Sequence, residues 1–553
     1  MSNDIKIAIA QINTSVGSIK SNIDKIVAAR AKAALANADL VIFGELTVAG
    51  YPPEDLVLKP AFQHAVEVAV AGLAEKTADG GPALLIGSPW CLEGHLYNAA
   101  LLLDRGMISA VRTKNQLPNY GVFDEKRVFT KGPLAGPIAF RGLRLGVMIC
   151  EDMWCGDVAE CLDESGAEIF VVINGSPFET DKQDDRLNYA IARVTESNLP
   201  LIYVNLVGGQ DELVFDGSSF VLNPDRSLSL KALAFEEELL MTQWRRSPDG
   251  WICDTGQIAD EMETLDSVYR ALVLGVRDYV NKNEFPGILI GLSGGIDSAL
   301  TTAIAVDAVG SERVHCVMMP SPYTSQASLY DASECCRLLN VKLESIDIRP
   351  AMIAFEKMLG SYFKDQAVDV TEENIQARIR GMLLMALSNK FRYMVLSTGN
   401  KSEMSVGYAT LYGDMCGGYA ALKDVYKSTV FELSLQRNKK RPPGCLGPDG
   451  NVFPHRIITK PPSAELKPDQ IDQDTLPPYE VLDEILYRMI EQDMVKDDIV
   501  TEGFDSAIVE RIWHMLNGAE YKRRQAPPGV KTTRRAFGRD RRYPIINGFK
   551  GEM

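Results

Sequence analysis

Long hydrophobic runs, cysteine pairs, histidine clusters and an excess of basic charge are all missing from this sequence. No stretch of its 553 residues approaches 18 consecutive apolar residues, and the N-terminal residues lead into a strand-like run without the apolar core of a signal peptide. We therefore expect a cytoplasmic protein with no membrane partner.

Cysteine and charge narrow the class of protein further. The ten cysteines contain no C-x-x-C pair and the five histidines are scattered, so buried thiols are expected rather than disulfides or zinc ligands. The formal net charge of -16 argues against general binding of DNA or RNA, which needs a basic surface. An enzyme with small-molecule substrates and no nucleic-acid partner is the better expectation.

The length predicts more than one domain, because single cores rarely extend beyond about 250–300 residues. A polar stretch rich in turn formers lies near the middle, which predicts a domain at residues 1–245, a linker at 246–264 and a second domain at 265–553. Both domains alternate strand-like and helix-like segments, so the fold class is α/β. In the second domain this alternation predicts a parallel, doubly wound sheet with ligands beyond the carboxyl ends of its strands.

A strand, a glycine-rich turn and a helix follow one another at the start of the second domain. Glycines in such a turn let the backbone approach a ligand, and the amides that open the next helix are free donors, so the turn predicts an anion cradle. An ordinary structural turn is the alternative. The residues of the turn are Gly291, Leu292, Ser293, Gly294, Gly295, Ile296, Asp297 and Ser298.

Asp297 stands where a kinase-type phosphate loop has its lysine. A carboxylate would repel a phosphate unless a divalent cation lies between them, so the turn also predicts Mg²⁺. The motif Ser-Gly-Gly-Ile-Asp-Ser resembles that of the ATP pyrophosphatase family. The fold of this family is Rossmann-like, of the adenine nucleotide alpha hydrolase type. The resemblance implies that the turn holds the β,γ-pyrophosphate of ATP while the α-phosphate is attacked.

Three polar residues in the first domain follow strand-like runs. Glu45 comes after residues 41–43, Lys114 after 110–112, and Cys150 after 146–149. A thiol is only a few per cent thiolate at neutral pH, so a nucleophilic cysteine needs a base and a positive neighbour, which Glu45 and Lys114 would supply. Each residue alone is more often inert or solvated, but their joint occurrence favours a catalytic set.

The sequence segments around these residues resemble those of the nitrilase, or carbon–nitrogen hydrolase, superfamily. The resemblance covers residues 4–245 and implies an αββα sandwich in which Cys150 is the nucleophile, Glu45 the general base and acid, and Lys114 the stabiliser of the oxyanion. Glu125 matches the second glutamate of the family, which orients the lysine. Residues 174–178 and Lys182 resemble the glutaminase branch, which implies that Tyr120, Ser176 and Lys182 hold the amino-acid end of glutamine.

Three segments of the second domain carry a further resemblance: residues 373–378, residues 398–403, which directly follow a predicted strand, and residues 411–414. They resemble the branch of the pyrophosphatase family that amidates nicotinic acid adenine dinucleotide (deamido-NAD⁺). By that match Glu403 would join Asp297 on Mg²⁺, and the family's paired domains imply a homo-oligomer formed through the synthetase-type domain. Residues 439–454 and 459–478 are rich in proline, glycine and charge, which predicts lids over the site. The implied contacts with ATP come from Thr398, Lys427 and Ser463, and those with deamido-NAD⁺ from Asn374, Glu403, Tyr408, Ala409, Thr410, Leu411, Asp414 and Lys522.

Together the two domains predict a ligase that frees ammonia from glutamine and delivers it to an adenylated acid. The resemblances imply that ATP and deamido-NAD⁺ are the other substrates and that AMP, pyrophosphate and glutamate are released. Three alternatives remain at this point: a glutamine-dependent ligase with a different acid acceptor, a tRNA-thiolating enzyme, and a chain whose first domain is an inactive interaction module. Basic surface and paired cysteines would favour the tRNA enzyme, and the sequence has neither.

Overall fold

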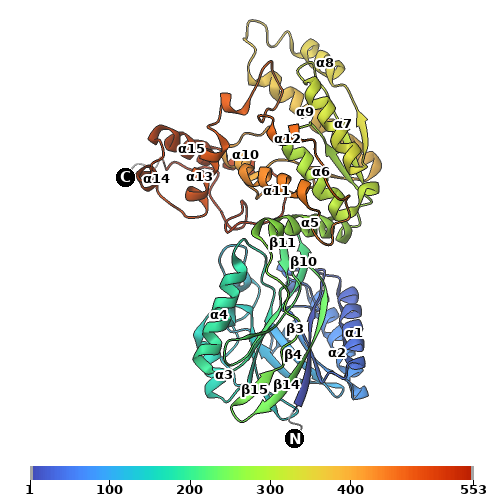
Figure 1. Cartoon of the computed structure of the whole chain (residues 1–553), viewed down its shortest axis with the longest axis vertical. Helices are drawn as coiled ribbons and strands as arrows, with labels where there is room; N and C mark the ends of the chain where they lie inside the picture. The colour runs from blue at the N-terminus through green and yellow to red at the C-terminus, as the bar shows by residue number, and fades with distance from the viewer. Residues whose placement is uncertain (1–3, 550–553) are drawn as a thin grey trace. The chain divides into compact units, whose positions relative to one another are not determined.

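The computed structural model describes residues 4–549 and divides the chain into two compact units, with the boundary in the sequence between Met262 and Glu263 (Figure 1). Residues 250–253, which lie in the predicted linker, form the last strand of the first unit, because Trp251 and Cys253 are buried in its core. No helix among residues 4–549 is long and apolar enough to cross a membrane.

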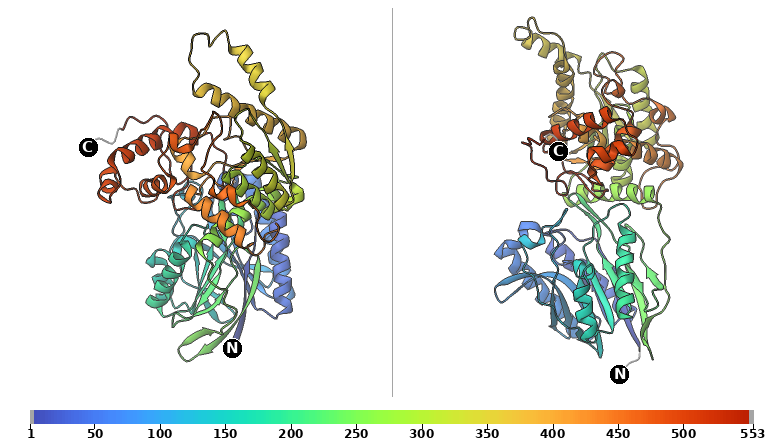
Figure 2. Two further views of the ribbon diagram at one scale, coloured as in Figure 1. Left: turned by 45° about the horizontal axis from the view of Figure 1, so that its top comes forward. Right: turned by 90° about the vertical axis from the view of Figure 1, so that its left-hand side faces the viewer.

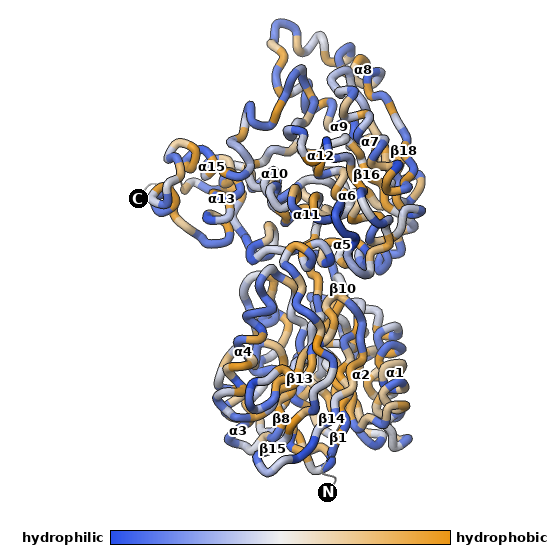
Figure 3. Tube along the Cα trace, viewed as in Figure 1, coloured by the Kyte–Doolittle hydropathy of each residue, from blue (hydrophilic) through white to orange (hydrophobic). Residues whose placement is uncertain are grey.

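Unit 1 is a four-layer sandwich of two sheets between two pairs of helices (Figures 1 and 2). Alternate residues of each strand point to opposite faces. The inner faces of both sheets share one apolar core, whereas the outer face of one sheet packs on α1 and α2 and that of the other on α3 and α4. Figure 3 shows the apolar strand β8 between these helical layers. The predicted αββα sandwich is confirmed.

The strands of unit 1 form a seven-stranded sheet, a six-stranded sheet and a hairpin. The seven-stranded sheet has the order β15-β14-β1-β2-β3-β4-β5, with β1, β2 and β3 parallel; the six-stranded sheet has the order β13-β12-β9-β8-β7-β6, with β7, β8 and β9 parallel. The strand bounds are β1 Asp4–Gln11, β2 Leu40–Phe43, β3 Ala83–Leu92, β4 His95–Asp104, β5 Met107–Thr113, β6 Ile138–Phe140, β7 Leu143–Ile149, β8 Ile169–Asn174, β9 Leu201–Asn205, β10 Val207–Gln210, β11 Leu213–Asp216, β12 Phe220–Leu222, β13 Leu228–Lys231, β14 Glu238–Ser247 and β15 Gly250–Cys253. The helices are α1 Ile19–Leu35, α2 Pro60–Lys76, α3 Gly156–Glu164 and α4 Lys182–Ser197, with 3₁₀ turns η1 Glu54–Leu58, η2 Thr77–Asp79, η3 Glu125–Arg127 and η4 Cys150–Met153.

Unit 2 is built on a five-stranded sheet of order β18-β17-β16-β19-β20 in which every pair is parallel. Helices α8 and α9 pack on apolar residues of β16, β17 and β19, while α6 and α7 also contact the sheet and α5 and α11 pack on α6. The chain order reverses between β16 and β19, and an α/β sheet opens a ligand crevice at such a point. The predicted parallel sheet is confirmed.

Helices α10, α13, α14 and α15 of unit 2 form a second apolar cluster. Residues 522–542, which are rich in lysine and arginine, pack against this part, because Lys531 and Arg541 are buried and Phe537 belongs to the cluster. The strand bounds of unit 2 are β16 Ile288–Gly291, β17 Val314–Met318, β18 Lys342–Ser345, β19 Met394–Ser397 and β20 Tyr419–Ala420. The helices are α5 Thr264–Lys282, α6 Ile296–Val309, α7 Gln326–Leu339, α8 Arg349–Leu359, α9 Val370–Phe391, α10 Lys401–Val406, α11 Lys427–Lys439, α12 His455–Thr459, α13 Tyr479–Ile490, α14 Lys496–Thr501, α15 Ser506–Gly518 and α16 Glu520–Arg523, with 3₁₀ turns η5 Ser311–Arg313 and η6 Asp472–Asp474.

Candidate active sites

A buried thiol in unit 1 lies at the meeting point of strand ends from both sheets. Glu45 follows β2, Lys114 follows β5 and Cys150 opens η4 directly after β7, with a left-handed backbone of φ 48°. The backbone amide of Glu45 donates to the Asn174 carbonyl at the end of β8 at 3.2 Å, which ties the two sheet edges together. The structure thus brings the three predicted residues into one buried cluster.

Lys114 is completely buried and donates to two carboxylates. Its Nζ lies 2.6 Å from Glu45 Oε1 and 2.9 Å from Glu125 Oε1. Burial lowers the pKa of the ammonium, but the charges of Glu125 and Glu45 outweigh burial and raise that pKa well above its ordinary value. Lys114 is therefore a fixed positive charge, which is what the stabilisation of an oxyanion requires.

The thiol of Cys150 is neutral in the resting site. Burial, followed by the negative charge of Glu45, raises its pKa well above the ordinary value, and Lys114 compensates only partly. Glu45 is held for proton transfer by Asn98, which donates to Oε1 at 2.7 Å, and by the Gly175 amide, which donates to Oε2 at 2.9 Å. A substrate that enters this site would find a protonated nucleophile beside an oriented carboxylate.

Further side chains that the sequence analysis did not single out hold this cluster in place. Tyr51 donates its hydroxyl to Glu125 at 2.9 Å, and burial raises the pKa of Glu125 to about 7 against the lowering effect of Lys114. Asp152 accepts from the backbone amides of residues 115, 116 and 149 at 2.7–3.1 Å, so one carboxylate fixes both the Lys114 segment and the Cys150 turn. Its place two residues after the nucleophile was the available signal.

The residues predicted to hold glutamine surround the same turn at different depths. Tyr120 is half exposed and donates to both carboxylate oxygens of Glu151, at 3.1 and 3.0 Å. Ser176 is buried and accepts from Arg186 Nε at 3.1 Å, while Lys182 opens α4 with its Nζ 4.6 Å from the ring centre of Trp154. A partly exposed ammonium and hydroxyl beside a buried thiol suit the polar end of an amino acid.

The glycine-rich turn of unit 2 joins β16 to α6 at the reversal of strand order. Gly294 has φ 82°, and a Cβ there would collide with the carbonyl oxygen of Ser328, so only glycine fits. The turn is braced by the Ser293 hydroxyl, which accepts from the Gly295 amide at 3.2 Å and lies 3.1 Å from the Ser298 hydroxyl. The amides that open α6 are left to a ligand, as an anion site requires.

Two cavities flank this turn and collect most of the predicted ligand residues. One, of about 190 Å³, is lined by residues 293–298, Thr398, Glu403, Tyr408, Ala409, Asp414, Lys427 and Ser463. The other, of about 240 Å³, is lined by Gly291, Leu292, Ser293, Thr398, Asp414 and Ser463 and also by Arg380. Arg380, which the sequence analysis did not single out, donates to the Met319 carbonyl at 3.0 Å, and burial lowers its pKa to about 10.

Four other predicted residues build the loop beside these cavities. Thr410 donates its hydroxyl to Asn374 at 2.8 Å, and Lys522 donates to the carbonyls of residues 407 and 409 at 2.7 and 2.8 Å. The carbonyl of Leu411 accepts from Arg378 at 3.2 Å. The structure therefore brings these residues to the edge of the site, where they hold residues 407–411.

A lysine lies between the two carboxylates predicted to bind a metal. Lys427 donates to Asp297 and lies 3.5 Å from Glu403, and Asn400 donates to the other oxygen of Asp297 at 2.9 Å. Burial raises the pKa of Glu403 to about 8, because the charge of Lys427 lowers it only partly and that of Asp297 raises it. The pair is therefore short of positive charge, and a cation would relieve that shortage.

Only one of the two predicted lids lies at the cavities. Residues 460–466 and Asp472 line them, and Asp472 accepts from Tyr479 at 2.8 Å. Residues 439–454 pack instead against α6 and α11, where Arg437 bridges buried Asp307 at 2.7 Å and the Pro448 carbonyl at 2.8 Å. The prediction of a lid at residues 439–454 is therefore wrong for this conformation, because that loop carries the partners of a buried ion pair.

Comparison with known proteins extends over the whole chain. A sequence model of the carbon-nitrogen hydrolase family matches residues 6–247, and one of NAD synthase matches residues 268–526. A glutamine-dependent NAD(+) synthetase of Rhodobacter capsulatus is 48% identical and that of Acinetobacter baylyi is 45% identical, with 100% and 99% of both chains covered.

Solved structures agree with these sequence matches. The glutamine-dependent NAD+ synthetase from Acinetobacter baumannii, in complex with ADP, superposes with a TM-score of 0.79 at 44% identity and covers 99% of each chain. The enzyme of the same name from Cytophaga hutchinsonii gives a TM-score of 0.82 at 20% identity over 99% of this chain and 98% of that one. At this identity the match shows only that the fold is shared.

The glycine-rich turn generates a test of its geometry. Gly294→Ala should lower the free energy of unfolding of unit 2 by more than the roughly 1–3 kcal/mol of left-handed strain alone, because its methyl group also meets the Ser328 carbonyl. Gly450→Ala is the matched control, since Gly450 has φ 79° and open space around it. Differential scanning calorimetry of both variants measures the difference, and equal losses would contradict the predicted collision.

Proposed function

This chain belongs to the glutamine-dependent NAD(+) synthetases, and we propose from that premise that its two units divide the reaction between a glutaminase site and an adenylating site. It is an enzyme, a ligase that uses glutamine as the donor of its amide nitrogen. A ligase with a different acid acceptor is not favoured, because the relatives compared over the full chain share one activity. The observation that carries the proposal is the pair of separate sites, a buried cysteine cluster in one unit and a glycine turn with carboxylates in the other.

In unit 1, Cys150 attacks the side-chain amide of glutamine. Glu45 accepts the thiol proton as the sulfur bonds to the amide carbon, and it returns a proton to the departing nitrogen, so ammonia leaves and a thioester remains. Lys114 stabilises the oxyanion with a charge that its two carboxylates keep in place. Glu45 then activates a water molecule that releases glutamate and restores the thiol.

The polar end of glutamine would be held at the mouth of the same site. Lys182 suits the α-carboxylate, and Tyr120 and Ser176 supply hydroxyls near the Cys150 turn. Buried Arg186 supports this arrangement, because it donates to Asp216 and to the carbonyls of residues 176 and 177 at 2.8–2.9 Å and so fixes the loop that carries Ser176.

In unit 2, the nicotinate carboxylate of deamido-NAD⁺ attacks the α-phosphorus of ATP. The backbone amides after Ser293 hold the β,γ-phosphates, with Thr398, Lys427 and Ser463 around the nucleotide and the remaining loop residues toward the dinucleotide. Pyrophosphate leaves, an adenylate forms, and ammonia displaces AMP to give the carboxamide of NAD⁺.

The side chains at the turn fit Mg²⁺. Mg²⁺ is commonly bound by one or two carboxylates together with substrate phosphates, and Asp297 and Glu403 are the carboxylates at the phosphate cradle. Within residues 4–549, no group of three or more His, Cys, Asp and Glu side chains could hold a metal by itself, which agrees with a site that the nucleotide completes. When bound, Mg²⁺ neutralises charge on the departing pyrophosphate.

An apolar surface on unit 2 supports a homo-oligomer. Helices α8 and α9 and their connection expose Ile353, Met358, Tyr362, Val368, Val370, Met382 and Met385, and Figure 2 shows this segment projecting from unit 2. Apolar patches of this kind on soluble proteins mark interaction surfaces. A second copy of this chain is the proposed partner. Separately, the proposed location of the protein is the cytoplasm.

The division of labour is tested at the nucleophile. Cys150→Ala should lower glutamine-driven NAD⁺ formation by roughly 10³-fold or more, because no other group replaces the thiol. Synthesis from added ammonium salts should persist, since that substrate bypasses unit 1. Cys161→Ala is the matched control on α3, and NAD⁺ is quantified by mass spectrometry. Loss of both activities in Cys150→Ala alone would reject the two-site scheme.

The second site is tested at Asp297. Asp297→Asn should slow pyrophosphate release by about 10²-fold or more with glutamine and with ammonium alike, because both nitrogen donors share one adenylate. Asp498→Asn, at an exposed position on α14, provides the control. A coupled pyrophosphate assay at several Mg²⁺ concentrations gives the rates, and an unchanged rate would remove Asp297 from the metal site.

The oligomer is tested on α9. Met382→Glu should weaken self-association at least about tenfold, because a carboxylate would be buried without a partner in an apolar interface. Gln492→Glu adds the same charge after α13 and should leave the association unchanged. Sedimentation equilibrium measures both, and a monomeric wild type would refute the proposal.

A further inference from the structure

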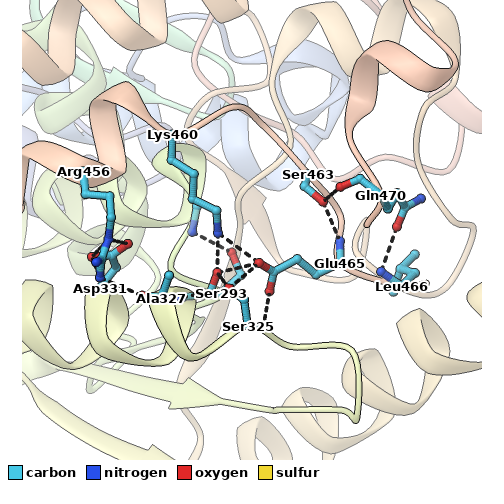
Figure 4. Close-up of polar contacts among 12 residues, drawn as sticks. Ser293, Ser325, Ala327, Asp331, Arg456, Lys460, Ser463, Glu465, Leu466 and Gln470 are labelled. Carbon is cyan, nitrogen blue, oxygen red and sulfur yellow. Dashed lines mark hydrogen bonds and ion pairs between the residues drawn. The ribbon is translucent and has the colours of Figure 1, made fainter. Parts of the chain in front are cut away.

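Lys460 is placed at the phosphate turn by a short helix that is pinned to α7. Helix α12 ends at Thr459, and its Arg456 donates to both oxygens of Asp331 on α7 at 2.8–3.1 Å (Figure 4). This ion pair fixes where the chain leaves the helix. The next residue, Lys460, points back toward the first turn of α7, as Figure 4 shows.

Ser328 lies between the ammonium of Lys460 and the glycine-rich turn. The ammonium donates to the hydroxyl of Ser328 and to Glu465 Oε1, the latter at 2.9 Å. The backbone of Ser328 is the same one that excludes any Cβ at Gly294. Lys460 and Ser328 line the cavity of about 190 Å³ together with residues 293–298.

This cavity has little positive charge of its own. The carboxylates of Asp297, Glu403, Asp414, Glu465 and Asp472 line it, whereas Lys427 and Lys460 are its basic residues. Lys427 is already engaged by Asp297 and Glu403. A leaving group with several negative charges therefore needs Lys460 in addition to the turn amides and a divalent cation.

Glu465 can release Lys460 at low cost because it has other donors. Its carboxylate accepts from the hydroxyls of Ser325 and Ser328 at 2.8 and 2.7 Å and from the Ser325 amide at 3.2 Å. Burial raises the pKa of Glu465, but hydrogen bonds from Ser328, Lys460 and Ser325 outweigh burial and lower it, so the carboxylate is charged. Three hydrogen bonds would remain after the ammonium leaves.

We propose that Lys460 is a phosphate-binding residue that rests on Glu465 in the ligand-free chain and transfers its ammonium to the β,γ-phosphates of the nucleotide. Glu465 is then the competitor that holds Lys460 ready. This inference rests on the proposed binding of ATP at residues 293–298.

The test measures binding of inorganic pyrophosphate and Mg²⁺ to the full chain by titration calorimetry, together with the KM for ATP when ammonium is the nitrogen donor. Lys460→Met should weaken pyrophosphate binding at least about tenfold and raise the KM for ATP similarly, because a charge-assisted hydrogen bond is lost. Lys460→Arg should keep most of the affinity, since its guanidinium also binds phosphate.

Glu465→Gln separates this role from a purely structural one. Removal of the competing carboxylate should tighten pyrophosphate binding, opposite in sign to Lys460→Met. If both variants weaken binding equally, the pair is only a structural bridge, and if Lys460→Met binds pyrophosphate like the wild type, Lys460 is not a ligand. Gly294→Ala is the reference variant for the turn. If Gly294→Ala loses pyrophosphate binding while Lys460→Met keeps it, only the Lys460 inference fails. If Gly294→Ala retains pyrophosphate binding, the turn itself is not the phosphate site.

Discussion

Lys114 lies without solvent contact between the carboxylates of Glu45 and Glu125, and this arrangement constrains everything around it. A buried charge that loses its partner costs several kcal/mol, so the two glutamates and the lysine must be placed together by the fold. The ends of β2 and β5 in the seven-stranded sheet place Glu45 and Lys114, and η3 places Glu125. The backbone contact between Glu45 and Asn174 joins this sheet to the edge of the other sheet, which carries Cys150. Burial and the charge of Glu45 raise the pKa of the Cys150 thiol well above its ordinary value, and Lys114 lowers it only partly, so the resting thiol is protonated.

The second unit uses a similar arrangement for a different chemistry. Lys427 is buried beside Asp297 and Glu403 at the carboxyl ends of parallel strands, where an α/β sheet leaves its crevice. Here the carboxylates outnumber the lysine and burial makes Glu403 hard to ionise. The site is therefore not balanced by itself, which supports the proposal that a nucleotide binds there together with a divalent cation.

Hydrophobic periodicity and short sequence motifs provided a large part of the prediction. Alternation of strands and helices predicted the α/β class and the parallel sheet of unit 2. Polar residues at strand ends identified Glu45, Lys114 and Cys150 as one candidate set, because α/β proteins place their chemistry at such ends. The roles of Asp152, Asn98, Tyr51 and Arg186 were not predicted, since each depends on a contact with a residue 30 or more positions away. Lys460 lies within the predicted lid at residues 459–478, but the sequence gives no sign of its partner, because Ser328 is 132 positions away.

By itself the sequence determined the α/β class, the order of elements and the chemistry at each strand end, because these depend on local hydrophobic pattern and residue type. Tertiary structure decided which of two similar loops lines the cavities: Lys460 and Glu465 bond to Ser328 on α7, whereas Gly447 and Pro448 bond to Asp307 and Arg437. Both loops have the same kind of composition, and only partners far away in the chain distinguish them. It also decided that Gly294 must be glycine, because the obstructing carbonyl belongs to another helix.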